Sequence, residues 1–174
     1  MIVQEISLDN HKLIKKFLSL PYQIYQEFTQ WVPPLSTDSS RIFDRRRNPF
    51  YQQSQAAFFL VLDHTGQPTG RLAILNNIPY NQFNHERTAF FFLFECQDDP
   101  AISKELFAAG YDWSKKQGLN RIFGPKGFSA LDGLGFLTRG FEHPPAFGIP
   151  YNPPYYPDLI EAAGFQRVSD IVSG

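Results

Sequence analysis

The chain has 174 residues, a length typical of one domain with its own buried core. Apolar residues make up 43% of the chain and charged residues 19%, which argues against disorder. The formal net charge of -1 gives no overall attraction for nucleic acid or anionic lipid. We therefore expect neither a nucleic-acid nor a membrane partner.

Features of the whole chain also bear on its compartment. Its start lacks the basic and apolar regions of a signal peptide, and its longest apolar runs, residues 56–62 and 89–94, are too short to span a bilayer. These features predict a cytoplasmic protein. The lone cysteine, Cys96, excludes an intramolecular disulfide, and the four histidines lie in separate segments, so we expect no metal site.

The first part of the chain predicts a strand followed by a helix. Residues 1–8 alternate apolar and polar side chains, and Asp9 or Asn10 can cap a helix with apolar positions at Leu13, Ile14, Phe17 and Leu18. Pro21 interrupts this helical pattern, although an apolar trend continues beyond it. The proline-rich residues 31–34 then force an extended turn, and residues 41–44 can form a short helical turn.

A β-hairpin is the clearest local feature of the sequence. Residues 56–62 and 69–75 are apolar runs of strand length, and the polar link between them contains Gly66 and Pro68. After a polar connection, residues 89–94 form an apolar run typical of a strand that is covered on both faces. We expect this third strand to lie in the middle of the sheet.

A long amphipathic helix follows that strand. Asp98, Asp99 and Pro100 provide its cap and first turn, and Gly118 closes it. A short strand at residues 121–123 comes next.

The last third of the chain is less regular. The glycine-rich residues 124–140 fit a wall or lid of a pocket, and residues 146–149 are a further candidate strand. Residues 154–164 predict a helix and residues 165–172 a final strand. The order of all these elements predicts an α/β fold with a mixed sheet flanked by helices.

The end of the chain carries a family resemblance. Asn152 opens the last predicted helix, and Gly164 with Phe165 ends it before the final strand. This ending resembles the GNAT superfamily of N-acetyltransferases, in particular a bacterial GNAT-like subfamily of unassigned reaction. Further matching segments are residues 31–34, 48–50, 94–96, 124–125 and 150–156. The resemblance implies one GNAT-like domain over residues 1–174, with a mostly antiparallel central sheet.

The resemblance also implies acetyl-CoA as the cofactor and a place for it. In GNAT enzymes the strand before the long helix splays from the next strand, and the pantetheine arm pairs with the backbone exposed in the gap. By this resemblance we expect cofactor contacts from Phe94, Glu95, Cys96, Ile122, Phe123 and Asn152.

The loop that precedes the long helix departs from the family pattern. GNAT enzymes hold the pyrophosphate of the cofactor on backbone N–H groups of a glycine-rich loop there. This chain has Asp98, Asp99 and Pro100 instead. The two carboxylates would repel a pyrophosphate, and Pro100 has no N–H to donate. The favoured reading is that these residues simply cap the start of the helix.

Two side chains are candidates for proton transfer. Glu95 ends the buried strand, where some GNAT enzymes place a base for the amine, and partial burial would raise its pKa toward that use. The other reading of Glu95 is a carboxylate paired with a neighbouring cation. Tyr156 lies one turn before Ile160, which stands where the family places its tyrosine acid. Tyr156 is therefore either an acid in a shifted geometry or an ordinary packing residue.

Two functions remain open from the sequence. The first is an acyl-CoA-dependent N-acyltransferase for a small-molecule or amine substrate, with Glu95 as the base and Tyr156 as the acid. The second is a catalytically degenerate GNAT-like binding or interaction domain without the phosphate loop. The chain stops soon after its last predicted strand, whereas relatives continue into a further domain. We therefore expect the face left uncovered to be buried by self-association as a homodimer.

Overall fold

The computed structural model describes residues 1–34, 41–129, 132–146 and 148–172. At its centre is a five-stranded sheet in the order β1-β2-β3-β4-β5. Strands β1 (Ile2–Glu5), β2 (Gln55–Leu62), β3 (Pro68–Asn76) and β4 (Thr88–Cys96) pair antiparallel in turn, whereas β5 (Arg121–Phe123) lies parallel to β4. The predicted α/β class with a mixed, mostly antiparallel sheet is confirmed.

The β2–β3 hairpin forms within one residue of its predicted bounds. Its turn is held by the Asp63 carboxylate, which accepts hydrogen bonds from the backbone N–H groups of Thr65 and Gln67. Gly66 has a φ of 80°, a left-handed conformation that glycine adopts without strain. Both strands are buried along almost their whole length, so the hairpin forms the middle of the core.

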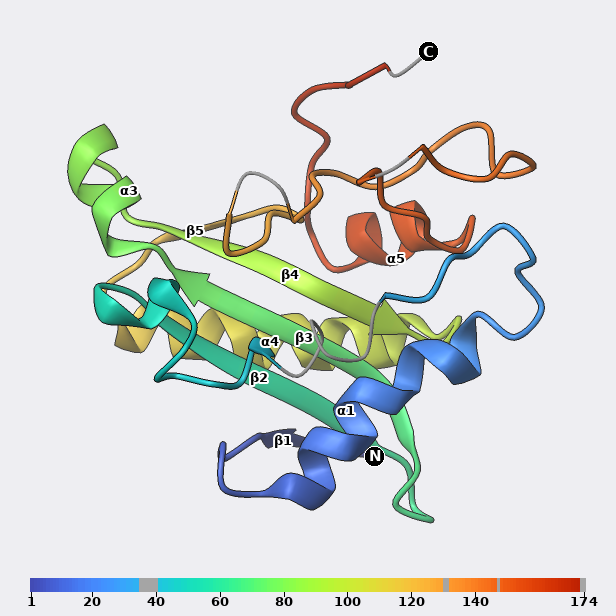
Figure 1. Ribbon diagram of the computed structural model, residues 1–174, viewed down its shortest axis with the longest axis horizontal. Helices are drawn as coiled ribbons and strands as arrows, with labels where there is room; N and C mark the ends of the chain where they lie inside the picture. The colour runs from blue at the N-terminus through green and yellow to red at the C-terminus, as the bar shows by residue number, and fades with distance from the viewer. Residues whose placement is uncertain (35–40, 130–131, 147, 173–174) are drawn as a thin grey trace.

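Helices cover both faces of the sheet (Figure 1). On one face, α4 (Pro100–Lys116) and α5 (Tyr156–Ala162) pack on apolar side chains that include Leu72, Ile74 and Phe91. On the other face, α1 (His11–Ile24) contributes Phe17 to a second apolar cluster. The sheet therefore separates two cores, and no helix in the described part of the chain is long and apolar enough to cross a membrane.

The helices match the sequence expectations in part. Asn10 caps α1 and Asp99 caps α4, as predicted. However, α1 continues through Pro21 to Ile24, so the proline does not end the helix. The polar connection before β4 contains an additional helix, α3 (Ile78–Asn84), which Asn77 caps through its side chain. A short 3-10 turn, η1 (Pro49–Gln52), precedes β2.

The described residues of the two strands predicted near the end of the chain do not form strands. The Ile149 N–H donates to the Ala146 carbonyl and not to a neighbouring strand, and residue 147 of that predicted strand lies outside the described residues. Residues 165–172 follow α5 without pairing to the sheet, and Figure 1 shows them leading away from it. Their apolar side chains Val168, Ile171 and Val172 are exposed. An alternating pattern predicts a strand only where a neighbouring strand is available for pairing.

Candidate functional site

The short strand β5 pairs along its whole length with the beginning of β4. Their register ends with Phe90 opposite Phe123, and the last backbone contact between these segments joins the Lys126 N–H to the Phe91 carbonyl at 2.9 Å. Beyond that point β4 continues to Cys96 without a partner strand on this side among the described residues. Ile122 and Phe123 therefore lie in the closed, paired part of this region, and the gap opens further along β4.

A β-bulge reorients the end of β4. Leu93 has a φ of 52°, and the pairing with β3 passes from Ala73–Phe92 to Arg71–Glu95, so β4 carries one extra residue. Beyond the bulge, the Cys96 backbone faces the gap, whereas the N–H of the residue after β4, Gln97, donates to the Thr69 carbonyl of β3 at 3.0 Å. Strand alternation directs the Phe94 backbone to the same side.

The backbone N–H and carbonyl of Cys96 are both hydrogen-bonded to tyrosine hydroxyls. The Cys96 N–H donates to the Tyr156 hydroxyl oxygen at 3.0 Å, and the Tyr155 hydroxyl donates to the Cys96 carbonyl at 3.0 Å. Both groups through which Cys96 could pair with a cofactor arm are therefore engaged by the chain itself. Of the three β4 residues expected to contact the cofactor, residues 94–96, only Phe94 still has a backbone that faces the open gap.

The Glu95 carboxylate lies at the centre of a buried polar network. Its Oε2 accepts a hydrogen bond from the Tyr156 hydroxyl at 2.6 Å, and its Oε1 lies 3.5 Å from Nη2 of Arg71. The side chains of this ion pair are 13% and 7% exposed. Burial raises the pKa of Glu95 above its ordinary value, while the Arg71 cation and the Tyr156 hydroxyl lower it. The structure thus brings Glu95 and Tyr156 together.

Two members of this network, Arg71 and Tyr25, were not predicted from the sequence. Tyr25 follows α1 and donates from its hydroxyl to the Tyr151 carbonyl at 3.3 Å. Burial and the nearby Glu95 charge raise the pKa of Tyr25 well above its ordinary value. For Arg71 a signal existed, since a charged residue within an apolar strand needs a partner. For Tyr25 no local signal existed, because its contacts come from segments distant in the sequence.

The start of α4 is closed by its own residues. The Asp99 side chain accepts a hydrogen bond from the Ala101 N–H at 2.8 Å, and its carbonyl accepts one from the Ile102 N–H at 3.1 Å. Pro100 has no N–H to offer, and Asp98 adds a second carboxylate. The expected helix cap is confirmed, and these residues do not fit a diphosphate group.

Asn152 has a structural place that differs from the expected one. It does not cap α5, because the N-cap is Tyr155, which makes no side-chain capping bond. Instead the buried Asn152 amide accepts from the Leu137 N–H at 2.7 Å and donates to the Leu137 carbonyl at 3.2 Å. Asn152 therefore fastens the loop around residue 137 to the segment that leads into α5.

The Cys96 side chain is buried and poorly suited to nucleophilic chemistry. Burial, with Asp99 and Asp98 nearby, raises the pKa of its thiol to about 12. A thiol with so high a pKa stays protonated near neutral pH, and the thiolate is the reactive form. Cys96 thus acts as a packing residue of the core.

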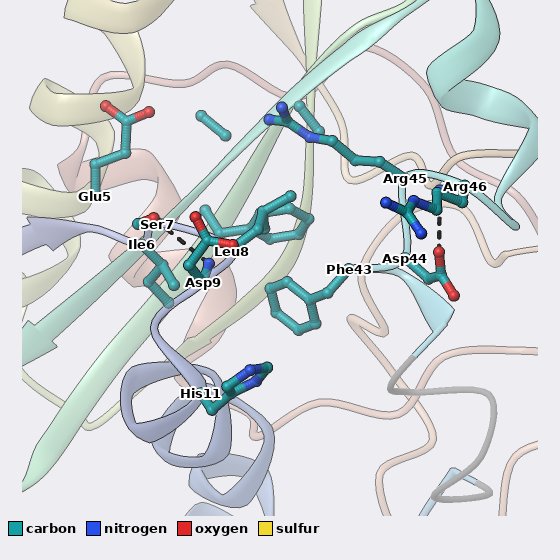
Figure 2. A pocket seen from close by; sticks show the side chains of 13 residues that line it. Glu5, Ile6, Ser7, Leu8, Asp9, His11, Phe43, Asp44, Arg45 and Arg46 are labelled. Carbon is teal, nitrogen blue, oxygen red and sulfur yellow. Dashed lines mark hydrogen bonds between the residues drawn. The ribbon is translucent and has the colours of Figure 1, made fainter.

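A separate cavity of about 710 Å³ lies at the other end of the sheet order (Figure 2). It is bounded by the connection from β1 to α1, by the start of β2 and by residues 43–46. Its polar lining mixes Glu5, Asp9 and Asp44 with Arg45 and Arg46. Because the lining carries both carboxylates and cations, it does not favour a ligand of one sign of charge. The buried network around Glu95 is therefore the candidate centre for chemistry.

Comparison with known sequences found no matching family model. The chain is 26% identical over 159 residues to a bacterial ceramide synthase of Caulobacter vibrioides, covering 91% of this chain and 41% of that protein. It is also 26% identical over 164 residues to Protein YghO of Escherichia coli, covering 94% of this chain and 42% of that protein. The chain thus spans about two fifths of the length of these relatives.

Two of the solved structures that this chain resembles have acetyltransferase names. An aminoglycoside acetyltransferase from an uncultured soil sample, in complex with sisomicin, matches with a TM-score of 0.59 at 10% identity, over 99% of this chain and 93% of that one. A putative acetyl transferase from Pyrococcus furiosus matches with a TM-score of 0.51 at 14% identity, over 99% of each chain. The fold of the chain is therefore the GNAT fold.

Proposed function

We propose that this chain, with its GNAT fold, is an N-acyltransferase domain that acylates an amine. The carrying observation is the buried Glu95 carboxylate, which lies next to the open end of β4 and is hydrogen-bonded to Tyr156 at 2.6 Å. The names of the similar proteins support the same chemistry. Aminoglycoside acetyltransferases acylate amino sugars, and a ceramide is a fatty acyl amide of an amino alcohol.

The two side chains can together balance the protons of such a reaction. The amine nitrogen forms a bond to the acyl carbon, the bond to the leaving thiolate breaks, and the amine must lose a proton. Glu95 accepts that proton on Oε1, which has the longer contact at 3.5 Å. Tyr156 gives its proton to the thiolate, and the Glu95 carboxyl group then rotates so that its new proton crosses the 2.6 Å contact to the Tyr156 oxygen. Burial raises the pKa of Tyr156, so its hydroxyl keeps the proton until it is needed.

The predicted acetyl-CoA cofactor does not fit in the arrangement that the family resemblance implied. At the start of α4, Asp99 accepts the hydrogen bond of a backbone N–H group that a diphosphate would need. The hydroxyls of Tyr155 and Tyr156 are hydrogen-bonded to the backbone of Cys96. We propose that the acyl donor is a thioester recognised without its diphosphate at this helix end.

The acceptor belongs to the amines, and one relative suggests a subclass. The relative named a ceramide synthase would act on a long-chain amino alcohol, and we propose that class as the first to test. This chain spans about two fifths of that protein. The proposal therefore concerns the acyl transfer to the amine by this domain, and not the whole activity of the relative.

Glu95→Gln is the direct test of the proposed base. We expect the wild-type chain to form an amide from a thioester and a long-chain amino alcohol, and the variant to be slower by about a hundredfold or more. Product formation followed by mass spectrometry measures the rate. Glu105→Gln, which removes an exposed carboxylate of α4, is the matched control and should keep the wild-type rate. Equal rates for Glu95→Gln and the wild type would contradict the proposal.

The second candidate function is a GNAT-like binding domain without catalysis. The closed start of α4 and the occupied Cys96 backbone favour it, since both remove places where a cofactor would bind. In the same assay this candidate predicts no amide from the wild-type chain with any thioester, together with saturable binding of the amine.

A further inference from the structure

Arg71 is a buried cation on β3 that reaches across to helix α1. Its Nη1 donates to the Phe17 carbonyl at 2.8 Å, and its guanidinium carbon lies 4.9 Å from the centre of the Phe17 ring. The residue is 6% exposed. A buried guanidinium is stable only when its donors find acceptors, and a backbone carbonyl inside a helix is normally already bonded.

Pro21 explains why this carbonyl is free. In an α-helix the carbonyl of residue 17 accepts from the N–H of residue 21, and proline has no N–H. The helix nevertheless continues beyond Pro21 to Ile24, so the Phe17 carbonyl stays in place without its usual partner. Arg71 supplies the missing donor from the neighbouring strand.

The other end of the guanidinium faces the candidate base. Nη2 of Arg71 lies 3.5 Å from Oε1 of Glu95, and Arg71 and Glu95 are paired residues on the adjacent strands β3 and β4. Among the described residues, Nε of Arg71 is the buried side-chain atom without a hydrogen-bond partner. The orientation of the guanidinium therefore rests on its contacts to Phe17 and Glu95.

We propose that Arg71 is the positioning residue for Glu95, and that Pro21 fixes Arg71 by leaving the Phe17 carbonyl open to it. Arg71 does not touch the reacting atoms. It holds the Glu95 carboxylate in orientation and favours its charged form, which is the form that can accept a proton. The inference rests on the proposed role of Glu95, but its test reads Glu95 directly and needs no substrate.

The other titratable groups near Glu95 carry no charge that could replace Arg71. Tyr25 after α1, Tyr155 and Tyr156 at the start of α5, and Cys96 on β4 all have pKa values raised by burial. They are neutral near pH 7, and the Tyr156 hydroxyl donates a hydrogen bond to Glu95. Arg71 is thus the cation of this network that opposes the effect of burial on the carboxylate.

Carbon NMR of the chain with labelled glutamate carboxyls can follow Glu95 as the pH changes, and Glu95→Gln assigns its signal. We expect Arg71→Met to raise the Glu95 pKa by about one unit or more, because an adjacent cation lowers a carboxyl pKa by that amount. Arg71→Lys keeps the charge but loses the fork of donors, so its shift should be smaller.

Pro21→Ala tests the link to α1 while Arg71, Glu95 and Tyr156 all stay in place. The new N–H of residue 21 competes with Arg71 for the Phe17 carbonyl, so we expect the Glu95 pKa to rise by less than in Arg71→Met. Pro79→Ala is the matched control, since Pro79 lies in the first turn of α3, where no carbonyl is left open. It should leave the Glu95 titration unchanged.

Each outcome decides one part of the inference. An unchanged Glu95 titration in Arg71→Lys and Arg71→Met overturns the role of Arg71, and if Arg71→Met does not fold, Arg71→Lys and Pro21→Ala carry the test. An unchanged titration in Pro21→Ala overturns the role of Pro21. If the pKa shifts occur while the wild type forms no amide, the network stands and the proposed function fails. If the wild type forms the amide while no variant shifts the Glu95 pKa, the proposed function stands and the positioning role of Arg71 fails.

Discussion

Glu95 contacts Arg71 of β3 and Tyr156 of α5, and its protonation should be visible in the stability of the protein. Burial is the strongest influence and raises its pKa above the ordinary value, against the lowering effects of Arg71 and Tyr156. A carboxyl that binds its proton more tightly in the folded than in the unfolded chain stabilises the fold more as the pH falls. This gain grows as the pH falls through the raised pKa and is complete below the unfolded value.

We therefore expect the free energy of unfolding of the wild type, relative to that of Glu95→Gln, to increase as the pH is lowered from neutral toward about 4.5. Glutamine does not titrate, so the comparison cancels the other carboxyls of the chain. Urea unfolding at several pH values measures the difference. A difference that shrinks on acidification would mean that Arg71 and Tyr156 outweigh burial, and that the Glu95 pKa is lowered.

The sequence indicated individual site residues better than it indicated the residues that they contact. Glu95 and Tyr156 were both predicted as candidates, because the resemblance to GNAT enzymes implies a base at the end of that strand and an acid near the start of the last helix. The 2.6 Å contact between them joins residues 61 positions apart, and no local pattern encodes it. The alternative reading of Glu95, a carboxylate paired with a cation, also describes the structure correctly.

Among the elements, α4 was the most predictable because its signals are local. Asp99 as the cap, Pro100 at the first position and lysines in the last turn all act within one helical turn of an end. The same residues make this helix end a poor anion site. The path of α1 through Pro21 was not predictable in this way, because the donor that replaces the lost helical bond comes from β3.

The closed start of α4 leads to a prediction about the acyl donor. An enzyme that binds a diphosphate through charged hydrogen bonds loses about 1.5–3 kcal/mol for each bond when the group is removed, roughly tenfold or more in kcat/KM. We expect no such loss here. An acyl-pantetheine should be used with a kcat/KM within about tenfold of that for the acyl-CoA with the same chain.

Parallel assays with the two thioesters and one amine provide this ratio. Asp98→Asn serves as a companion variant, since it removes a carboxylate near the helix start and leaves the Asp99 cap intact. It should shift the ratio toward acyl-CoA. A wild-type preference for acyl-CoA of several hundredfold would show that the diphosphate is bound after all.

At the scale of the whole molecule, the sheet joins two cores that the chain builds from alternate residues of the same strands. In β2, Ala57, Phe59 and Val61 belong to the α4 side, whereas Phe58 and Leu60 belong to the α1 side. Such strands, buried on both faces, read as continuous apolar runs, which is why the sequence located them well. The unpaired residues 165–172 were misjudged because pairing depends on the rest of the sheet.

The shared strands suggest that the two cores unfold together, as one domain. Ile74 of β3 is fully buried on the α4 side, and Ile6, after β1, is 4% exposed on the α1 side. Each Ile→Val change removes one buried methyl group and should cost about 0.5–1.5 kcal/mol of the free energy of unfolding. If one cooperative unit unfolds, each variant shifts the whole urea transition, whichever core it weakens.

Fluorescence and circular dichroism should therefore give coincident transitions for Ile74→Val, Ile6→Val and the double variant. The two costs should add within about 0.5 kcal/mol, because the side chains lie on opposite faces of the sheet. Ile171→Val, at a position that is 69% exposed, is the control and should leave the midpoint unchanged. Separate transitions for the two probes, with each variant moving only one of them, would mean that the two faces unfold as independent units.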